Sequence, residues 1–195
     1  MELSRKLALR QKTCWFFKRK VMKAMESIGK QLLTGNVDVD EFFVGGQETG
    51  KKGRGKDRKQ LIVLAIEKRD KGISRMYGKV IPQADAENLG NFMREKIETK
   101  SNIKTDKWLG YKPLKSEFEN MVQLSSGEKG GNFPEIHRAI MLFKAWLRGI
   151  HHHVTDLQAY IDEYTYRFNR HFMNASIFDN LIRRMIKAKQ YYLYD

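Results

Sequence analysis

The sequence contains a single cysteine, Cys14, among its 195 residues. One cysteine excludes both an internal disulfide and a cysteine-rich zinc module. Long apolar runs are also lacking, since none approaches the roughly 20 residues that a membrane-spanning helix needs. The first residues, 1–6, contain no apolar region of the signal-peptide type. These absences favour a cytoplasmic chain that does not associate with a membrane.

Acidic residues are few relative to basic ones. The chain has 23 Asp and Glu against 37 Lys and Arg, which gives a formal net charge of +14. Such a balance indicates a polyanionic partner, and nucleic acid is the usual one. A basic ribosome-like protein, or one that is merely soluble, is the alternative. With 41% hydrophobic residues, the length suffices for one catalytic domain and a small appendage.

The first segment, residues 1–33, is basic and has a helical pattern. Two helices are expected within residues 2–28, separated by a break near residues 8–11. A short turn followed by a lysine-rich second helix is typical of part of a helix-turn-helix DNA-binding unit. The alternative is an amphipathic helical hairpin that packs on the next domain.

The rest of the chain predicts a mixed α/β layered domain. Strict alternation marks one strand and an apolar run marks the next, while stripes with helical spacing mark the helices. The order of these elements is compatible with the ribonuclease-H-like fold. The expected strands are residues 37–44, 60–67, 74–81, 102–105 and 121–124, and the expected helices are residues 84–97, 134–148, one opening with a capping box at Thr155-Asp156-Leu157-Gln158, and 177–190.

Basic side chains gather in two places suited to binding phosphates. Residues 47–59 form a polar loop with many cations, and the last helix is also basic. Such cations can contact the DNA backbone. For the loop, a solvated hairpin tip is the alternative. The candidate DNA-binding residues are Lys51, Lys52, Arg54, Lys56, Arg148, Arg183 and Arg184.

Two aspartates lie where a metal-dependent nuclease needs them. Phosphodiester cleavage with two divalent ions about 3.5–4 Å apart requires hard oxygen ligands on rigid elements. Asp40 lies within the strand 37–44 and Asp106 follows the strand 102–105. Aspartate is depleted in strands, although one that ends a strand, as Asp106 does, can simply form a turn. Asp38 shares a strand face with Asp40, so the pattern does not separate the two.

A third group lies on the helix 134–148. Spacing of three and four residues places His137, Met141, Lys144 and Arg148 on one face, beside the apolar face. From spacing alone, a lone helical histidine is more often structural than a ligand, and a lone lysine is more often a solvated charge. The pattern therefore gives His137 and Lys144 only as candidates.

Several motifs together resemble the DDE-type transposases of bacterial insertion sequences, in the branch called ISXO-like. The similarity covers roughly residues 4–171. The matching pieces are Val-Asp-Val-Asp-Glu-Phe-Phe-Val-Gly-Gly (37–46), Lys-Gly-Arg-Gly-Lys (52–56), Thr-Asp-Lys-Trp-Leu-Gly-Tyr (105–111), Phe-Lys-Ala-Trp-Leu-Arg-Gly-Ile-His-His (143–152) and Gln-Ala-Tyr-Ile-Asp-Glu-Tyr-Thr-Tyr-Arg-Phe-Asn-Arg (158–170).

The resemblance implies a role for each candidate residue. It makes Asp40, rather than Asp38, the first catalytic aspartate and Asp106 the second. His137 takes the third ligand position, which is Glu in most DDE enzymes, and Lys144 the basic position that follows it. The resemblance implies two Mg²⁺ or Mn²⁺ ions held by Asp40, Asp106 and His137.

The resemblance also implies the organisation and the activity of the chain. Residues 34–171 would form a ribonuclease-H-like catalytic domain, followed by a basic C-terminal helix in residues 172–195. The expected reaction is nicking of DNA at the ends of the insertion element, followed by transfer of the 3′ hydroxyl into target DNA. The expected assembly is a homo-oligomer on double-stranded DNA.

The N-terminus departs from the pattern of this branch. Full-length members usually begin with a cysteine-rich zinc ribbon and a complete helix-turn-helix, so we expect an N-terminally shortened chain. This departure keeps two alternatives open. One is a non-catalytic DNA-binding remnant or inhibitor of the full-length transposase, and the other is a metal-dependent nuclease of similar fold without strand transfer.

Overall fold

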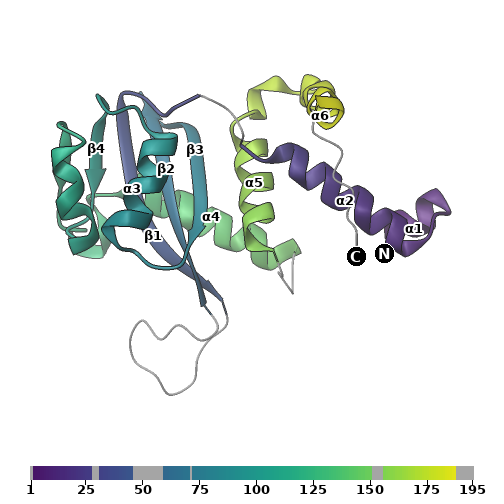
Figure 1. Ribbon diagram of the computed structural model, residues 1–195, viewed down its shortest axis with the longest axis horizontal. Coiled ribbons are helices and arrows are strands. Elements are labelled where there is room, and N and C mark those ends of the chain that lie inside the picture. Colours follow the sequence, from purple (N-terminus) through teal and green to yellow (C-terminus); the bar gives the residue numbers. More distant parts are fainter. Residues whose placement is uncertain (1, 28–30, 46–58, 71, 151–155, 188–195) are drawn as a thin grey trace, which may run out of the picture.

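A computed structural model describes residues 2–27, 31–45, 59–70, 72–150 and 156–187. Its centre is a five-stranded mixed sheet in the order β3-β2-β1-β4-β5. Strand β1 pairs antiparallel with β2 and parallel with β4, which places it at the middle of the sheet (Figure 1). The strands are β1 (Asn36–Gly45), β2 (Lys59–Arg69), β3 (Gly72–Ile81), β4 (Asn102–Thr105) and β5 (Met121–Gln123).

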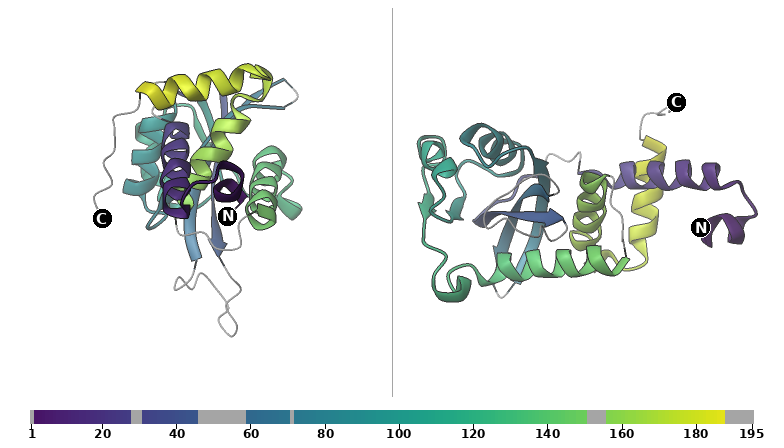
Figure 2. Two further views of the ribbon diagram at one scale, coloured as in Figure 1. Left: turned by 90° about the vertical axis from the view of Figure 1, so that its right-hand side faces the viewer. Right: turned by 90° about the horizontal axis from the view of Figure 1, so that it is seen from below.

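Helices α3 (Ala86–Lys96) and α4 (Pro134–Ile150) lie on opposite faces of this sheet (Figure 2). The alternation of β1 explains the two layers. Val37 and Val39 belong to the core under α3, whereas Phe42 belongs to the core under α4. A mixed sheet flanked by helices, with this strand order, confirms the predicted α/β ribonuclease-H-like fold class.

Helices α1 (Glu2–Leu7), α2 (Gln11–Met25), α5 (Leu157–Phe168) and α6 (Ser176–Lys187) extend from the β3 edge of the sheet (Figure 1). The 3₁₀ helices are η1 (Leu109–Ser116), which packs on α3, η2 (Glu128–Gly130) and η3 (His171–Met173). None of the helices in the described residues is both long and apolar enough to span a bilayer.

Helix α5 begins one residue later than the sequence pattern predicts. Its N-cap is Asp156, whose carboxylate accepts a hydrogen bond from the backbone N–H of Ala159 at 3.2 Å. Thr155, the predicted cap, lies outside the described residues. Gln158, the predicted partner in the capping box, instead uses its amide at the sheet edge. The N-cap is therefore Asp156 rather than the predicted Thr155, and the amide of Gln158 is used in tertiary contacts with β3.

The outer edge of β3 is closed by two amide side chains from the α5 region. Asn169 both donates to the carbonyl of Met76 and accepts from its N–H, each at 2.9 Å. Gln158 accepts from the N–H of Val80 at 2.9 Å and donates to the carbonyl of Gly78 at 3.3 Å. An open edge strand invites pairing with other chains. Here the two amides satisfy part of that edge.

The N-terminal hairpin packs on this same helical layer. Helix α2 contacts both α5 and α6, while α1 has no buried residue and projects away from the sheet (Figure 1). The guanidinium of Arg184, on α6, donates to the carbonyls of Ala24 and Glu26 at the end of α2. This packing is the one expected of the helical-hairpin alternative. A role of the hairpin in DNA binding stays a prediction.

Arg184 is expected to stabilise the fold, because its charged donors satisfy two helix-terminal carbonyls. Replacing it by alanine should lower the free energy of unfolding by about 2 kcal/mol, or about 4–8 °C in Tm. Its exposed neighbour Arg183 is the matched control, and Arg183→Ala should change stability by about 0.5 kcal/mol or less. Thermal unfolding of both variants checks this, and equal effects would contradict the capping role.

Candidate active site

Asp40 and Asp106 come together because their strands are parallel neighbours. Val39 of β1 is the register partner of Thr105, the last residue of β4. The residue after each of these is an aspartate, Asp40 within β1 and Asp106 just beyond the end of β4. The carboxylate of Asp40 is 18% exposed and lies on the face of the sheet that α4 covers. The register therefore brings the two predicted residues to the same end of neighbouring strands, and a shared site stays a prediction.

A tight turn fixes the backbone of Asp106. One of its carboxylate oxygens accepts a hydrogen bond from the backbone N–H of Trp108 at 2.9 Å. The amide of Gln123, on the neighbouring strand β5, donates to the carbonyls of Asp106 and Trp108 at 3.2 and 3.1 Å. The turn therefore depends on β5 as well as on β4.

His137 lies in the first turn of α4 and faces Asp40. Its Nε2 atom is 3.4 Å from a carboxylate oxygen of Asp40. On the other side of the ring, Gly130 has φ +78°, and a Cβ there would collide with Nδ1 and Cε1 of the imidazole. The ring centroids of Phe133 and His137 are 6.2 Å apart. The backbone at Gly130 therefore confines the imidazole and leaves its Nε2 directed at the carboxylate.

Lys144 follows His137 two turns later on α4. Its ammonium lies over the ring of Phe42, 5.0 Å from the centroid. Burial, together with the nearby charge of Arg148, lowers the pKa of Lys144, while the charge of Asp40 opposes that change. Lys144 is thus a partly buried cation close enough to Asp40 for their charges to interact.

The carboxylates of Asp40 and Asp106 lie near each other, and the raised pKa of Asp40 shows that its charge is disfavoured. Burial is the largest cause that raises the pKa of Asp40 to about 6, and the like charge of Asp106 is the second. The charge of His137 and the N–H of Glu41, which donates at 2.8 Å, act in the opposite direction. A carboxyl disfavoured in this way is stabilised by any added cation.

Asp38 has a different environment, although it lies on the same face of β1. It forms an ion pair with Lys68 of β2 at 2.8 Å and is 1% exposed. Its second oxygen has no hydrogen-bond partner among the described residues. Burial raises the pKa of Asp38, against the effect of Lys68. The pairing with Lys68 favours a structural role for Asp38, and Asp40 as the site carboxylate stays a prediction.

The donor set suits a hard divalent cation. Two carboxylates and one imidazole nitrogen are ligands that Mn²⁺ accepts, and the carboxylates suit Mg²⁺. The raised pKa of Asp40 marks a place where positive charge is missing. Within the described part of the chain, no group of three or more His, Cys, Asp or Glu side chains is close enough to hold a metal ion. Asp40, Asp106 and His137 therefore do not form a closed three-ligand group here, and metal binding by them stays a prediction.

The predicted DNA-binding residues are dispersed. Lys51, Lys52, Arg54 and Lys56 lie outside the described residues. Arg148 is exposed on α4, where its Nε donates to the carbonyl of Lys144 at 3.3 Å. Arg183 is exposed on α6. Arg184 is engaged with α2.

The sequence that contains Asp40, Asp106 and His137 matches a known protein family. The model of the ISXO2-like transposase domain matches residues 32–169. The chain belongs to this family. No curated protein matches the sequence. Membership in the ISXO2-like family supports a DNA transposase function and implies that the chain binds DNA. Members of such families generally use divalent metals.

Sequence reasoning missed the residues that hold the site in shape. Gly130 confines the imidazole, and Gln123 and Trp108 fix the turn of Asp106. In this ISXO2-like chain, Trp108 and Tyr111 were already inside a matching motif, Thr-Asp-Lys-Trp-Leu-Gly-Tyr. That motif was the available signal. The periodicity of the sequence gave no signal for Gln123 or Gly130.

The raised pKa of Asp40 predicts that this carboxylate destabilises the metal-free fold. Above about pH 6 the folded protein carries the buried charge, whereas below pH 3.8 the group is protonated in both states. The contribution of Asp40 to the free energy of unfolding therefore falls as the pH rises from about 4 to 6. Asp40→Asn should raise the free energy of unfolding at pH 8 by about 2–3 kcal/mol, with little effect near pH 4.

Denaturant unfolding at both pH values, with a chelator present, measures this difference. An Asp40→Asn variant that is less stable than the wild type at pH 8 would contradict it.

Proposed function

We propose that this transposase-family chain nicks DNA at the ends of an insertion element and joins the freed 3′ hydroxyl to target DNA. The observation that carries the proposal is a second carboxylate, Asp106, beside the buried carboxylate of Asp40, whose charge is disfavoured. Asp40 lies on β1 and Asp106 follows the parallel neighbour β4, and the charge of Asp106 helps to raise the pKa of Asp40. Structural aspartates are normally paired, as Asp38 is with Lys68.

The carboxylates of Asp40 and Asp106 would hold two divalent ions, with the Nε2 atom of His137 as a third ligand. Ions bound there would supply the positive charge that activates the attacking oxygen and stabilises the leaving oxygen. Strand β1 carries Asp40 and a hydrogen-bonded turn after β4 carries Asp106, so their oxygens would need little rearrangement when DNA binds. Such preorganisation is how a site lowers the reaction barrier.

His137 and Lys144 would divide the remaining work on α4. The neutral imidazole contributes a ligand without adding negative charge beside Asp40. The ammonium of Lys144 can approach a non-bridging phosphate oxygen and orient the strand to be cut. Its partial burial over Phe42 restricts its motion. Exposed cations such as Arg148 and Arg183 would add contacts to the DNA backbone.

Replacing either carboxylate should abolish cleavage without abolishing DNA binding. Asp40→Ala and Asp106→Ala each remove a ligand oxygen, and neither side chain is a phosphate-seeking cation. The measurement is Mn²⁺-dependent nicking of labelled DNA that carries the element's ends, with a binding assay on the same DNA. Asp38→Asn is the matched control and should nick far better than Asp40→Asn. Full cleavage by either alanine variant would contradict a site that needs both carboxylates.

His137 should set the metal preference. A site with two carboxylates and one imidazole should favour Mn²⁺ over Mg²⁺ more strongly than a three-carboxylate site. His137→Ala should lose most activity. His137→Glu should retain some and move the preference toward Mg²⁺. Nicking rates in each metal test this, and wild-type cleavage by His137→Ala would make His137 structural.

A further inference from the structure

The position of Asp106 is not fixed by the sheet alone. It follows Thr105, the last residue of β4, so its side chain is placed by the turn that leads into η1. That turn holds the charge of Asp106 near Asp40, where it raises the pKa of the Asp40 carboxyl, so the turn works against a like-charge repulsion. The contacts that tie the turn to the rest of the fold therefore determine how close the two carboxylates stay.

One tie fastens the turn to the start of α3. The indole nitrogen of Trp108 donates to the carbonyl of Ala84 at 2.6 Å. Gly110 lies against the same carbonyl, and a Cβ at Gly110 would collide with it. This contact anchors the turn to the helix layer. It does not connect the turn to β1, the strand that carries Asp40.

The tie to β1 is a hydrogen bond from Tyr111. Its hydroxyl donates to Glu41 Oε2 at 2.9 Å, and Glu41 is the residue after Asp40. The backbone N–H of Glu41 in turn donates to a carboxylate oxygen of Asp40 at 2.8 Å. From Asp40 through Glu41, Tyr111 and the turn to Asp106, the contacts form a continuous path around the two carboxylates.

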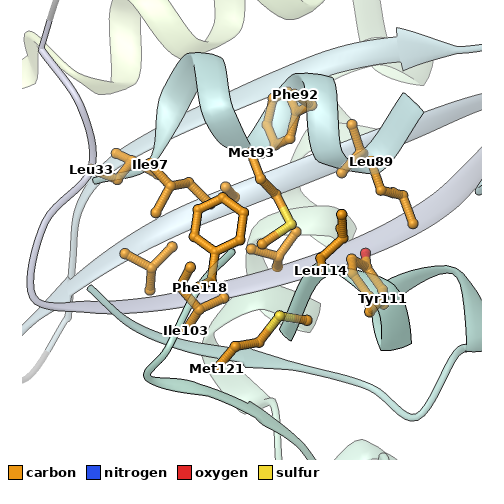
Figure 3. Packing of buried hydrophobic residues seen from close by; sticks show 14 of the residues in the cluster. Leu33, Leu89, Phe92, Met93, Ile97, Ile103, Tyr111, Leu114, Phe118 and Met121 are labelled. Carbon is orange, nitrogen blue, oxygen red and sulfur yellow. The ribbon is translucent and has the colours of Figure 1, made fainter. Parts of the chain in front are cut away.

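The hydroxyl of Tyr111 is not explained by core packing. The ring is fully buried in the same layer as Leu89 and Leu114 (Figure 3). A phenylalanine would fill nearly the same volume without a polar atom to satisfy. A buried hydroxyl and a carboxylate are each costly unless paired. Their pairing at this point therefore suggests a role beyond packing.

We propose that Tyr111 is a positioning residue, whose hydrogen bond to Glu41 holds the Asp106 turn against β1 so that Asp106 stays beside Asp40. The proposal rests on the proposed function, since it assigns Tyr111 a task in that same site. Tyr111 faces the α3 side of the sheet and acts through the turn and through Glu41. Removing its hydroxyl should loosen the turn and leave the core filled.

The test compares Tyr111→Phe with Tyr166→Phe. Tyr166 is also buried, and its hydroxyl bonds to the carbonyl of Ile177 and to Asn180 at 3.2 and 3.0 Å. Both variants lose one buried hydroxyl, so both should lose stability to a similar degree. Only Tyr111→Phe should affect the turn.

The first readout needs no metal. Amide hydrogen exchange over residues 106–111 should be about tenfold faster in Tyr111→Phe, the fold-change that loss of one hydrogen bond to a charged group gives. Tyr166→Phe should leave these rates unchanged. Glu41→Gln retains an acceptor for the hydroxyl and should open the turn less than Tyr111→Phe. Unchanged exchange in Tyr111→Phe would overturn the proposal, as would opening by Glu41→Gln alone.

The second readout concerns the site. Mn²⁺ binding, followed by electron paramagnetic resonance, should weaken about five- to tenfold in Tyr111→Phe. Nicking should show a lower kcat with an unchanged KM for DNA. Tyr111→Phe with wild-type Mn²⁺ affinity and kcat would overturn the positioning role. A wild type that binds no Mn²⁺ would instead overturn the proposed function, while the exchange rates would still decide whether Tyr111 holds the turn.

Discussion

The repulsion between Asp40 and Asp106 is the constraint on which the rest of the site depends. The parallel register of β1 and β4 brings the two carboxylates together, and burial together with the charge of Asp106 raises the pKa of Asp40. The surroundings offset that cost only in part. His137 approaches Asp40 at 3.4 Å, and Lys144 adds a partly buried positive charge. The remaining deficit of positive charge is the property that a divalent ion would satisfy.

The same repulsion explains why the turn that carries Asp106 makes several polar contacts with the rest of the fold. Trp108, Gln123 and Tyr111 each fix it to a different element, namely the start of α3, strand β5 and strand β1. The carboxylate of Asp106 is repelled by that of Asp40, so a turn that was free to move would carry Asp106 away from β1. Ties in three directions remove that freedom, and the entropy lost on cation binding falls accordingly.

The parts that the sequence predicted are those set by local periodicity. Alternation along β1 placed Asp40 and Phe42 on one face, and helical spacing placed His137 and Lys144 on one side of α4. Local patterns contain no information on contacts between distant segments. Tyr111 meets Glu41 across 70 residues, and Arg184 meets Ala24 across 160. Gln158, predicted as a capping-box partner, likewise bonds to an edge strand 80 residues away.

A histidine at position 137, which the resemblance predicts as the third ligand, is consistent with the electrostatics of the metal-free protein. Asp40 already has a pKa of about 6 with one like charge nearby. A glutamate at position 137 would add a second like charge, raise the pKa of Asp40 further and destabilise the fold. The imidazole of His137 avoids that charge and lowers the cost of ionising Asp40. The metal-free fold is thereby more stable, and the attraction for a cation is weaker than three carboxylates would give.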